Sequence, residues 1–137
     1  MTSAPKVRIT FETAGQIAVG TVFDANMLDA MNVADFGNQV MAFVQPKPRL
    51  NLLLNFEHVD YMSSAALTEL LRVNDTVRKG EGSVRLCGLS KDIRKVFQIT
   101  NLEKLFVIHD GDNAATATKR FERALALAAE DDAWAIP

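Results

Sequence analysis

The sequence predicts a single α/β domain with a mixed, mostly parallel sheet of four to five strands, about four helices and an initial β-hairpin. Three observations support this fold class. The 137 residues are enough for one domain with its own core. The first two apolar runs alternate with a period of two residues and are separated by a short turn. After them, strand-like and helix-like periods alternate, which requires parallel strands joined by helical crossovers.

The hairpin is predicted from residues 6–23. Apolar and polar residues alternate along each of the two runs, which is the pattern of a half-buried strand. Ala14 and Gly15 form the turn between them. The residues expected on one face of each strand are Val7, Ile9 and Phe11, then Ile17, Val19 and Phe23.

The alternating section follows from periodicity and from residues that start or stop helices. Segment 49–56 is apolar on both faces, which is typical of a central strand. Glycines at 80 and 82 are expected to stop the second helix. The expected elements are a helix over 32–45, strand 49–56, a helix over 63–79, strand 83–87, a helix opened by Ser90, strand 105–108 and a last helix capped by Asp112 or Asn113. The domain is expected to span 6–128, between a flexible lead at 1–5 and a C-terminal tail at 129–137, where Trp134 could dock.

Composition excludes several classes of protein. Fifteen basic and seventeen acidic residues give a net charge of −2, which argues against a dedicated nucleic-acid binder or a polybasic membrane sensor. The single Cys87 cannot form an intramolecular disulfide or a multi-cysteine zinc site. No apolar run reaches the ~18 residues of a membrane span, and the N-terminus lacks a signal peptide's apolar stretch. The expectation is a cytoplasmic domain without membrane insertion.

The sequence offers little for catalysis. No glycine-rich phosphate loop is present, and no metal or cofactor site is predicted. His58 and His109 are isolated, so we expect each to lie on the surface or to pack in a loop. Cys87 ends an apolar strand and is expected to be a small buried hydrophobe. No catalytic residue is predicted, and an enzyme is the weakest of the functional hypotheses.

One segment is distinctive, because a buried strand runs into two hydroxyl groups and then a helix. Ser63 and Ser64 lie at this junction. In parallel α/β folds, ligands and partners meet at this kind of strand-to-helix step, and the helix N-terminus favours an anion such as a phosphoryl group. The alternative is that one of the two serines serves only as an N-cap.

The segment LNLLLNFEHVDYMSSAALTELL resembles the STAS domain family, and within it the bacterial anti-sigma factor antagonists. Two further stretches carry the resemblance. GSVRLCGLSKDIRKVFQITNLEKLFVI is similar to the second half of the family, and Leu28-Asp29 with Val33 and Phe36 is similar to the start of its first helix. The likeness covers about residues 6–127, with three motifs in the right order.

The resemblance implies that Ser64 matches the serine phosphorylated by the family's regulatory kinase. Ser63 stands where the family usually has Asp, while Ala65 replaces a second Ser or Thr. Asp29 matches an acidic residue near that site. The implied partners are an anti-sigma factor that is also a serine kinase, and a PP2C-type phosphatase. The implied partner-binding residues are Asp29, Met62, Ser63, Ser64, Ala65, Leu67 and Thr68.

The implied function is a switch. The unmodified protein would sequester the anti-sigma factor and free a sigma factor, and phosphorylation of Ser64 would end the complex. The alternative is a constitutive STAS interaction module without a phosphorylation cycle, such as an accessory subunit of a transporter ATPase or a subunit of a signalling assembly. The departures at Ser63 and Ala65 are the main support for that alternative.

Overall fold

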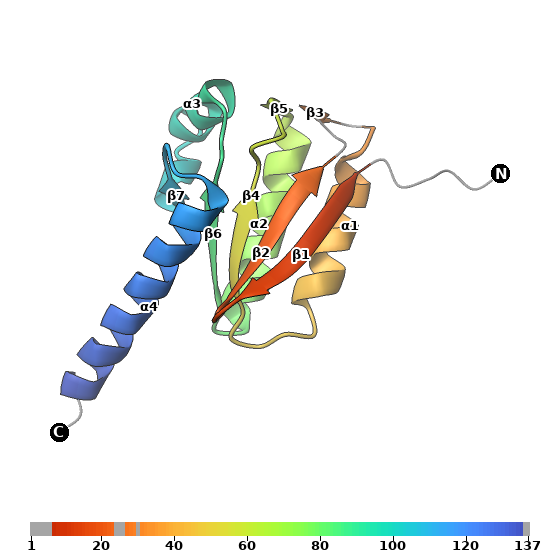
Figure 1. Ribbon diagram of the computed structural model, residues 1–137. Helices are drawn as coiled ribbons and strands as arrows, with labels where there is room; N and C mark the ends of the chain where they lie inside the picture. Colours follow the sequence, from red (N-terminus) through yellow and green to blue (C-terminus); the bar gives the residue numbers. More distant parts are fainter. Residues whose placement is uncertain (1–6, 24–26, 30, 136–137) are drawn as a thin grey trace.

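The computed structural model describes residues 7–23, 27–29 and 31–135, except for the side chains of Met27 and of residues 130–135 (Figure 1). The elements in chain order are β1 (Arg8–Ala14), β2 (Ile17–Phe23), β3 (Met27–Leu28), α1 (Val33–Val44), β4 (Asn51–Asn55), β5 (Tyr61–Met62), α2 (Ser64–Lys79), β6 (Ser83–Cys87), α3 (Lys91–Ile99), the 3₁₀ helix η1 (Leu102–Lys104), β7 (Val107–His109) and α4 (Ala114–Ala135).

The main sheet has five strands in the order β1-β2-β4-β6-β7. Strands β1 and β2 form an antiparallel hairpin, and every other neighbouring pair in this sheet is parallel. The predicted fold class is therefore confirmed, including the initial hairpin and the mixed sheet. A second, two-stranded parallel sheet joins β3 to β5, and the sequence did not predict it.

Helices cover both faces of the main sheet, and β4 shows why. Leu52 and Leu54 belong to the larger core, beneath α1 and α2, whereas Leu53 belongs to a smaller core beneath α4. All three leucines are fully buried. A strand that alternates between two cores must be apolar on both faces, which explains the continuous apolar run. In Figure 1, α1 and α2 lie together on one side of the strands and α4 crosses on the other.

Helix α2 ends at Lys79 with Gly80 as its C-cap, as expected, although neither glycine supplies the left-handed residue. The residue with a left-handed backbone is Glu81, at φ +66°, between the two glycines. The Gly82 N–H donates to the Val77 carbonyl at 2.9 Å and the Glu81 N–H donates to the Arg78 carbonyl at 3.0 Å, which is a Schellman motif. Gly82 is required for another reason, because a Cβ there would collide with the backbone of Leu50.

The predicted C-terminal tail is partly wrong. Helix α4 is capped by Asn113, whose side chain accepts from the Thr116 N–H at 2.8 Å, and it continues to Ala135. It therefore takes up most of the segment 129–137. The expected docking of Trp134 and the flexible lead at 1–5 both lie outside what the structure describes.

Candidate functional site

The two serines at the start of α2 have different roles. Ser63 is the N-cap: its backbone is extended and its side chain accepts a hydrogen bond from the Ala66 N–H at 3.3 Å. Ser64 is the first helical residue, and its side chain is exposed. Its hydroxyl forms no hydrogen bond with any described residue. The capping role is thus filled by Ser63, which leaves the Ser64 hydroxyl available to solvent.

The N-terminus of α2 provides a favourable environment for an anion. Within the described residues, the backbone N–H groups of Ser64 and Ala65 have no hydrogen-bond acceptor. The first turn contains no acidic residue. Unpaired N–H groups and the positive end of the helix dipole both stabilise negative charge at this place. A phosphoryl group on Ser64 would lie beside these groups.

The small sheet of β3 and β5 brings the segment after β3 next to the serines. Leu28 pairs with Met62, and the Ser63 N–H donates to the Leu28 carbonyl at 2.7 Å. Asp29 and Ser63 therefore follow directly from two paired strands. This pairing places Asp29 at the same edge of the molecule as Ser64.

Asp29 also organises the start of α1. Its Oδ1 accepts from the Met31 N–H at 2.9 Å, and its carbonyl accepts from the Val33 N–H at 2.9 Å. In return, the Asn32 side chain accepts from the Asp29 N–H at 3.0 Å. Such local bonds fix a turn. The side chain is half-buried, so the carboxylate is held in place at the rim of the site.

The structure divides the predicted partner-binding residues into two groups. Ser64, Ala65 and Thr68 are exposed, and Asp29 and Ser63 are half-buried. In contrast, the side chains of Met62 and Leu67 are only 3% and 6% exposed and belong to the larger core. These two residues support the surface from below and offer it almost no area, which corrects the prediction that they contact a partner.

Two exposed apolar side chains near the site were missed. Met31 is 73% exposed and Tyr61 is 48% exposed. Met31 follows Asp29, and Tyr61 is on β5, two residues before Ser63. Next to Tyr61 is an apolar hollow of about 220 Å³, lined by Tyr61, Met62, Asp92, Ile93 and Val96. The sequence signal was only that large apolar residues occur in two connecting segments, which did not distinguish exposure from burial.

The two histidines differ from each other. His58 is half exposed and stacks on Phe23, as expected for a histidine in a loop. His109 is buried at the end of β7 and lies in a network, which corrects the expectation that it lies on the surface or packs in a loop. Its Nε2 is 3.3 Å from the Arg85 guanidinium, and its Nδ1 is 3.6 Å from the Asp112 carboxylate. Burial, together with the charge of Arg85, lowers the pKa of His109.

Cys87 is fully buried at the end of β6, as predicted. Burial raises the pKa of its thiol to about 12, and the negative charge of Glu57 adds to the effect. Its Sγ is 3.7 Å from the Asn55 side-chain oxygen. A protonated thiol without access to solvent is a poor nucleophile.

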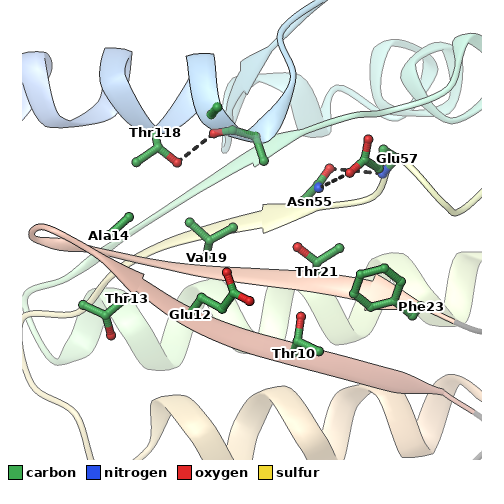
Figure 2. Close-up of a pocket in the computed structure, with 12 residues that line it drawn as sticks. Thr10, Glu12, Thr13, Ala14, Val19, Thr21, Phe23, Asn55, Glu57 and Thr118 are labelled. Carbon is green, nitrogen blue, oxygen red and sulfur yellow. Dashed lines mark hydrogen bonds between the residues drawn. The ribbon is translucent and has the colours of Figure 1, made fainter.

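A further hollow, of about 330 Å³, opens on the α4 face of the sheet between the hairpin and the start of α4 (Figure 2). Its walls carry threonines, the carboxylates of Glu12 and Glu57, and the ring of Phe23. Glu57 is held by the Asn55 side chain, whose Nδ2 donates to its Oε1 at 2.9 Å. None of its described lining residues is basic, so it is unsuited to a phosphate. It also lies on the face opposite α2, away from Ser64.

Neither a metal centre nor a membrane-crossing segment is found in the described part of the chain. There, no group of three or more His, Cys, Asp or Glu side chains is placed to hold a metal ion. Of its helices, none is sufficiently long and apolar to cross a membrane.

Comparison with known proteins places this geometry in context. A curated protein of Bordetella bronchiseptica, the candidate anti-sigma factor antagonist BtrV, is 33% identical over 71 residues, which are 52% of this chain and 61% of BtrV. The chain therefore matches less than two thirds of the length of that relative.

Solved structures share the fold. An anti-sigma factor antagonist (STAS) domain protein of Planctomyces limnophilus has a TM-score of 0.71 at 19% identity, covering 87% of this chain and 99% of that protein. The anti-sigma factor antagonist SpoIIAA in its unphosphorylated form has a TM-score of 0.69 at 21% identity, covering 84% of this chain and 96% of that chain. The Bacillus cell fate determinant SpoIIAA in its phosphorylated form has a TM-score of 0.63 at 22% identity, covering 82% of this chain and 98% of that chain.

The family itself is shown by sequence. Residues 9–117 match the STAS domain, which is most of the chain from β1 into the first turn of α4. The match includes the hairpin, the central strand and the junction at Ser63 and Ser64. The chain belongs to the STAS domain family.

Proposed function

We propose that this protein is an anti-sigma factor antagonist that is switched by phosphorylation of Ser64. In the unmodified state it binds an anti-sigma factor that is also a serine kinase, and so releases a sigma factor. The observation that carries the proposal is the exposed Ser64 hydroxyl, which Ser63 leaves free by capping α2. The similarity to BtrV and to both forms of SpoIIAA supports it.

The departure from the family's usual Asp at position 63 is compatible with this role. Ser and Asp are about equally good N-caps, so Ser63 keeps the cap that an Asp would supply. It removes one negative charge next to the phosphorylation site. A phosphoryl group on Ser64 would therefore meet less local repulsion than it would beside an aspartate.

The modification transfers the γ-phosphoryl group of ATP. A bond forms between Ser64 Oγ and phosphorus, the bond to the ADP oxygen breaks, and the serine proton passes to a base of the kinase or to water. The product carries −1.5 to −2 charges at about pH 7. Within the isolated domain the N–H groups of α2 stabilise that charge. Against a partner surface shaped for a hydroxyl, the added charge and bulk weaken the complex.

The first experiment locates the phosphate. The purified protein is incubated with ATP and the serine kinase encoded nearest to its gene, and the site is mapped by mass spectrometry. We expect one phosphate, on Ser64, which disappears in Ser64→Ala. The matched control is Ser63→Ala, which alters the neighbouring hydroxyl and should keep the phosphate on Ser64. No phosphate on the wild type, or an unchanged amount in Ser64→Ala, would overturn the proposal.

The alternative is a constitutive STAS interaction module, and it makes a different prediction. Such a module would bind its partner equally well as wild type and as Ser64→Asp. The switch predicts a large loss of affinity in Ser64→Asp, with Ser64→Ala retaining binding. Isothermal titration calorimetry measures both variants, and equal affinities would favour the constitutive module.

A further inference from the structure

A basic hollow lies on the α4 face of the sheet at the β7 edge, far along the sheet from the hollow of Figure 2. Helix α4 packs across β2, β4 and β6, whereas β7 is the last strand of the sheet. The hollow has a volume of about 560 Å³, and its lining residues are His109, Arg120, Arg123, Ala124 and Leu127. It is an open depression, bordered by His109 of β7 on one side and by one face of α4 on the other. The two elements lie at the same side of the molecule in Figure 1.

Strand register shows which β7 side chains face this hollow. Val107 pairs with Arg85, and His109 pairs with Cys87. The guanidinium of Arg85 lies 4.6 Å from the ring of Phe121 on α4, and Cys87 shares a core with that ring. The side chains of Val107 and His109 are thus on the α4 face of the sheet. Arg85 is on the same face, on the neighbouring strand β6.

Among the described side chains at this hollow, basic groups outnumber carboxylates. The members of the cluster are Arg85, His109, Asp112, Arg120 and Arg123. The carboxylate of the cluster is that of Asp112. Its Oδ2 lies 3.6 Å from His109 Nδ1 and 3.3 Å from Arg120 Nε. Arg85 contacts His109 and the Phe121 ring but no carboxylate of the described residues, and burial lowers its pKa. Arg123 has no ion pair with any described residue. Arg85 is partly withdrawn from water without a carboxylate partner, whereas Arg120 and Arg123 are exposed. An anion bound beside them would lower the cost of burying Arg85 and would pair with the two exposed guanidinium groups.

Large apolar side chains are exposed to solvent beside this hollow. Val107 is 50% exposed and Leu127 is 53% exposed. Each is on an element that lines or borders the hollow. Exposed apolar side chains that adjoin basic groups are typical of a surface for another protein, since a small inorganic anion would make no use of them.

We propose that this hollow between β7 and α4, which we call the basic groove, binds an acidic segment of a partner protein. The segment carries at least one apolar side chain. Its carboxylates pair with Arg120 and Arg123, with Arg85 adding positive charge from behind His109, and its apolar side chain covers Val107 and Leu127. A locally basic surface on a chain whose net charge is −2 is complementary to an acidic segment and not to a basic one. The groove is separate from the Ser64 surface, so this inference does not depend on the proposed switch.

The test uses a defined peptide as the probe. Fluorescein-labelled Asp-Glu-Asp-Leu-Glu-Asp-Glu is titrated with the full-length protein, and binding is followed by fluorescence anisotropy. We expect Arg123→Glu to weaken binding at least tenfold. The matched control is Lys95→Glu, which makes the same change of charge at an exposed position on α3 and should stay within twofold of wild type. Replacing the peptide leucine by serine should weaken binding at least fivefold.

A second measurement locates the peptide. In ¹H–¹⁵N spectra, saturating peptide should shift the amides of Val107, His109 and Leu127 and leave those of Ser64 and Ala65 unchanged. Ser64→Asp should bind the peptide as the wild type does. The proposal is overturned if the peptide does not bind at millimolar concentration, if Arg123→Glu binds equally, or if the leucine-to-serine peptide binds as tightly as the original. Self-association of the protein that Arg123→Glu abolishes, without peptide binding, would also overturn it.

Discussion

At the scale of single residues, Ser63 and Ser64 divide two tasks that one serine could not perform together. The Ser63 side-chain oxygen is engaged with the Ala66 N–H, so it stabilises the start of α2. The Ser64 hydroxyl faces solvent and is free of such a role. Stability and modification can therefore be changed independently, by substituting one residue or the other.

This division predicts a difference between two neighbouring alanine variants. Ser63→Ala should lower the free energy of unfolding by about 1 kcal/mol, because an N-cap hydrogen bond is lost. Ser64→Ala should leave it within about 0.5 kcal/mol of wild type, since alanine is a good helix former at an exposed position. Urea denaturation followed by circular dichroism measures both. Equal losses in the two variants would show that the capping assignment is wrong.

Burial of Cys87 predicts low thiol reactivity. At pH 8 the native thiol is protonated, because its pKa is raised to about 12, and it is shielded from solvent. We expect 5,5′-dithiobis(2-nitrobenzoic acid) to label the native protein only slowly and the unfolded protein at once.

The raised thiol pKa also makes stability depend on pH. In the unfolded chain the thiol ionises at an ordinary pKa, near 9.0. The wild type should therefore lose stability relative to Cys87→Ala as the pH rises above about 9. Fast native labelling at pH 8 would contradict this description.

At the scale of elements, the glycines around the end of α2 differ in what they permit. A Cβ at Gly80 would meet nothing closer than 3.5 Å, whereas a Cβ at Gly82 would meet the Leu50 amide nitrogen at 2.8 Å. The close approach is between the residue just before β6 and the residue just before β4, and it occurs at Gly82 but not at Gly80. Spacing along the sequence suggested that both glycines had the same role.

We predict that Gly82→Ala lowers the free energy of unfolding by about 2–3 kcal/mol, since backbone must move to admit the methyl group. Gly80→Ala is the matched control and should change it by less than about 1 kcal/mol, because its φ of −86° suits any residue. Thermal and urea unfolding of both variants checks the difference. A tolerated Gly82→Ala would contradict the close approach of Leu50.

Elements with several turns or several alternations could be predicted from sequence, and the short strand β7 only with shifted bounds, since 105–108 was expected and Val107–His109 is found; the two-residue strands could not be predicted. The run at 49–56 showed two apolar faces because the strand lies between two cores. Strands β3 and β5 have two residues each, too few to show a period of two, although their pairing brings Asp29 to Ser63. Of the candidate site, the Ser64 position was predicted, but the burial of Met62 and Leu67 depends on contacts distant in sequence.

At the scale of the whole molecule, the sheet separates two surfaces. The α2 side carries Ser64 at the carboxyl end of β5, and the α4 side carries both the polar hollow and the basic groove. The smaller core holds α4 in place through Phe121, which packs with Ile17 and Leu53. The position of the groove therefore depends on this core.

This arrangement predicts different effects for two apolar side chains of α4. Phe121→Ala should lower the free energy of unfolding by about 3–5 kcal/mol, because a fully buried ring leaves a cavity in the smaller core. Leu127→Ala, in an exposed position six residues later, should lower it by less than about 0.5 kcal/mol. Chemical denaturation measures both. Similar losses would mean that α4 does not pack on the sheet as described.

The central claim is that another protein distinguishes the free Ser64 hydroxyl from its phosphorylated form. The most direct measurement is the affinity of the anti-sigma factor kinase for the protein before and after stoichiometric phosphorylation, by isothermal titration calorimetry in the presence of ADP. We expect phosphorylation to weaken binding at least a hundredfold, which is about 2.7 kcal/mol. Affinities that agree within twofold would contradict it.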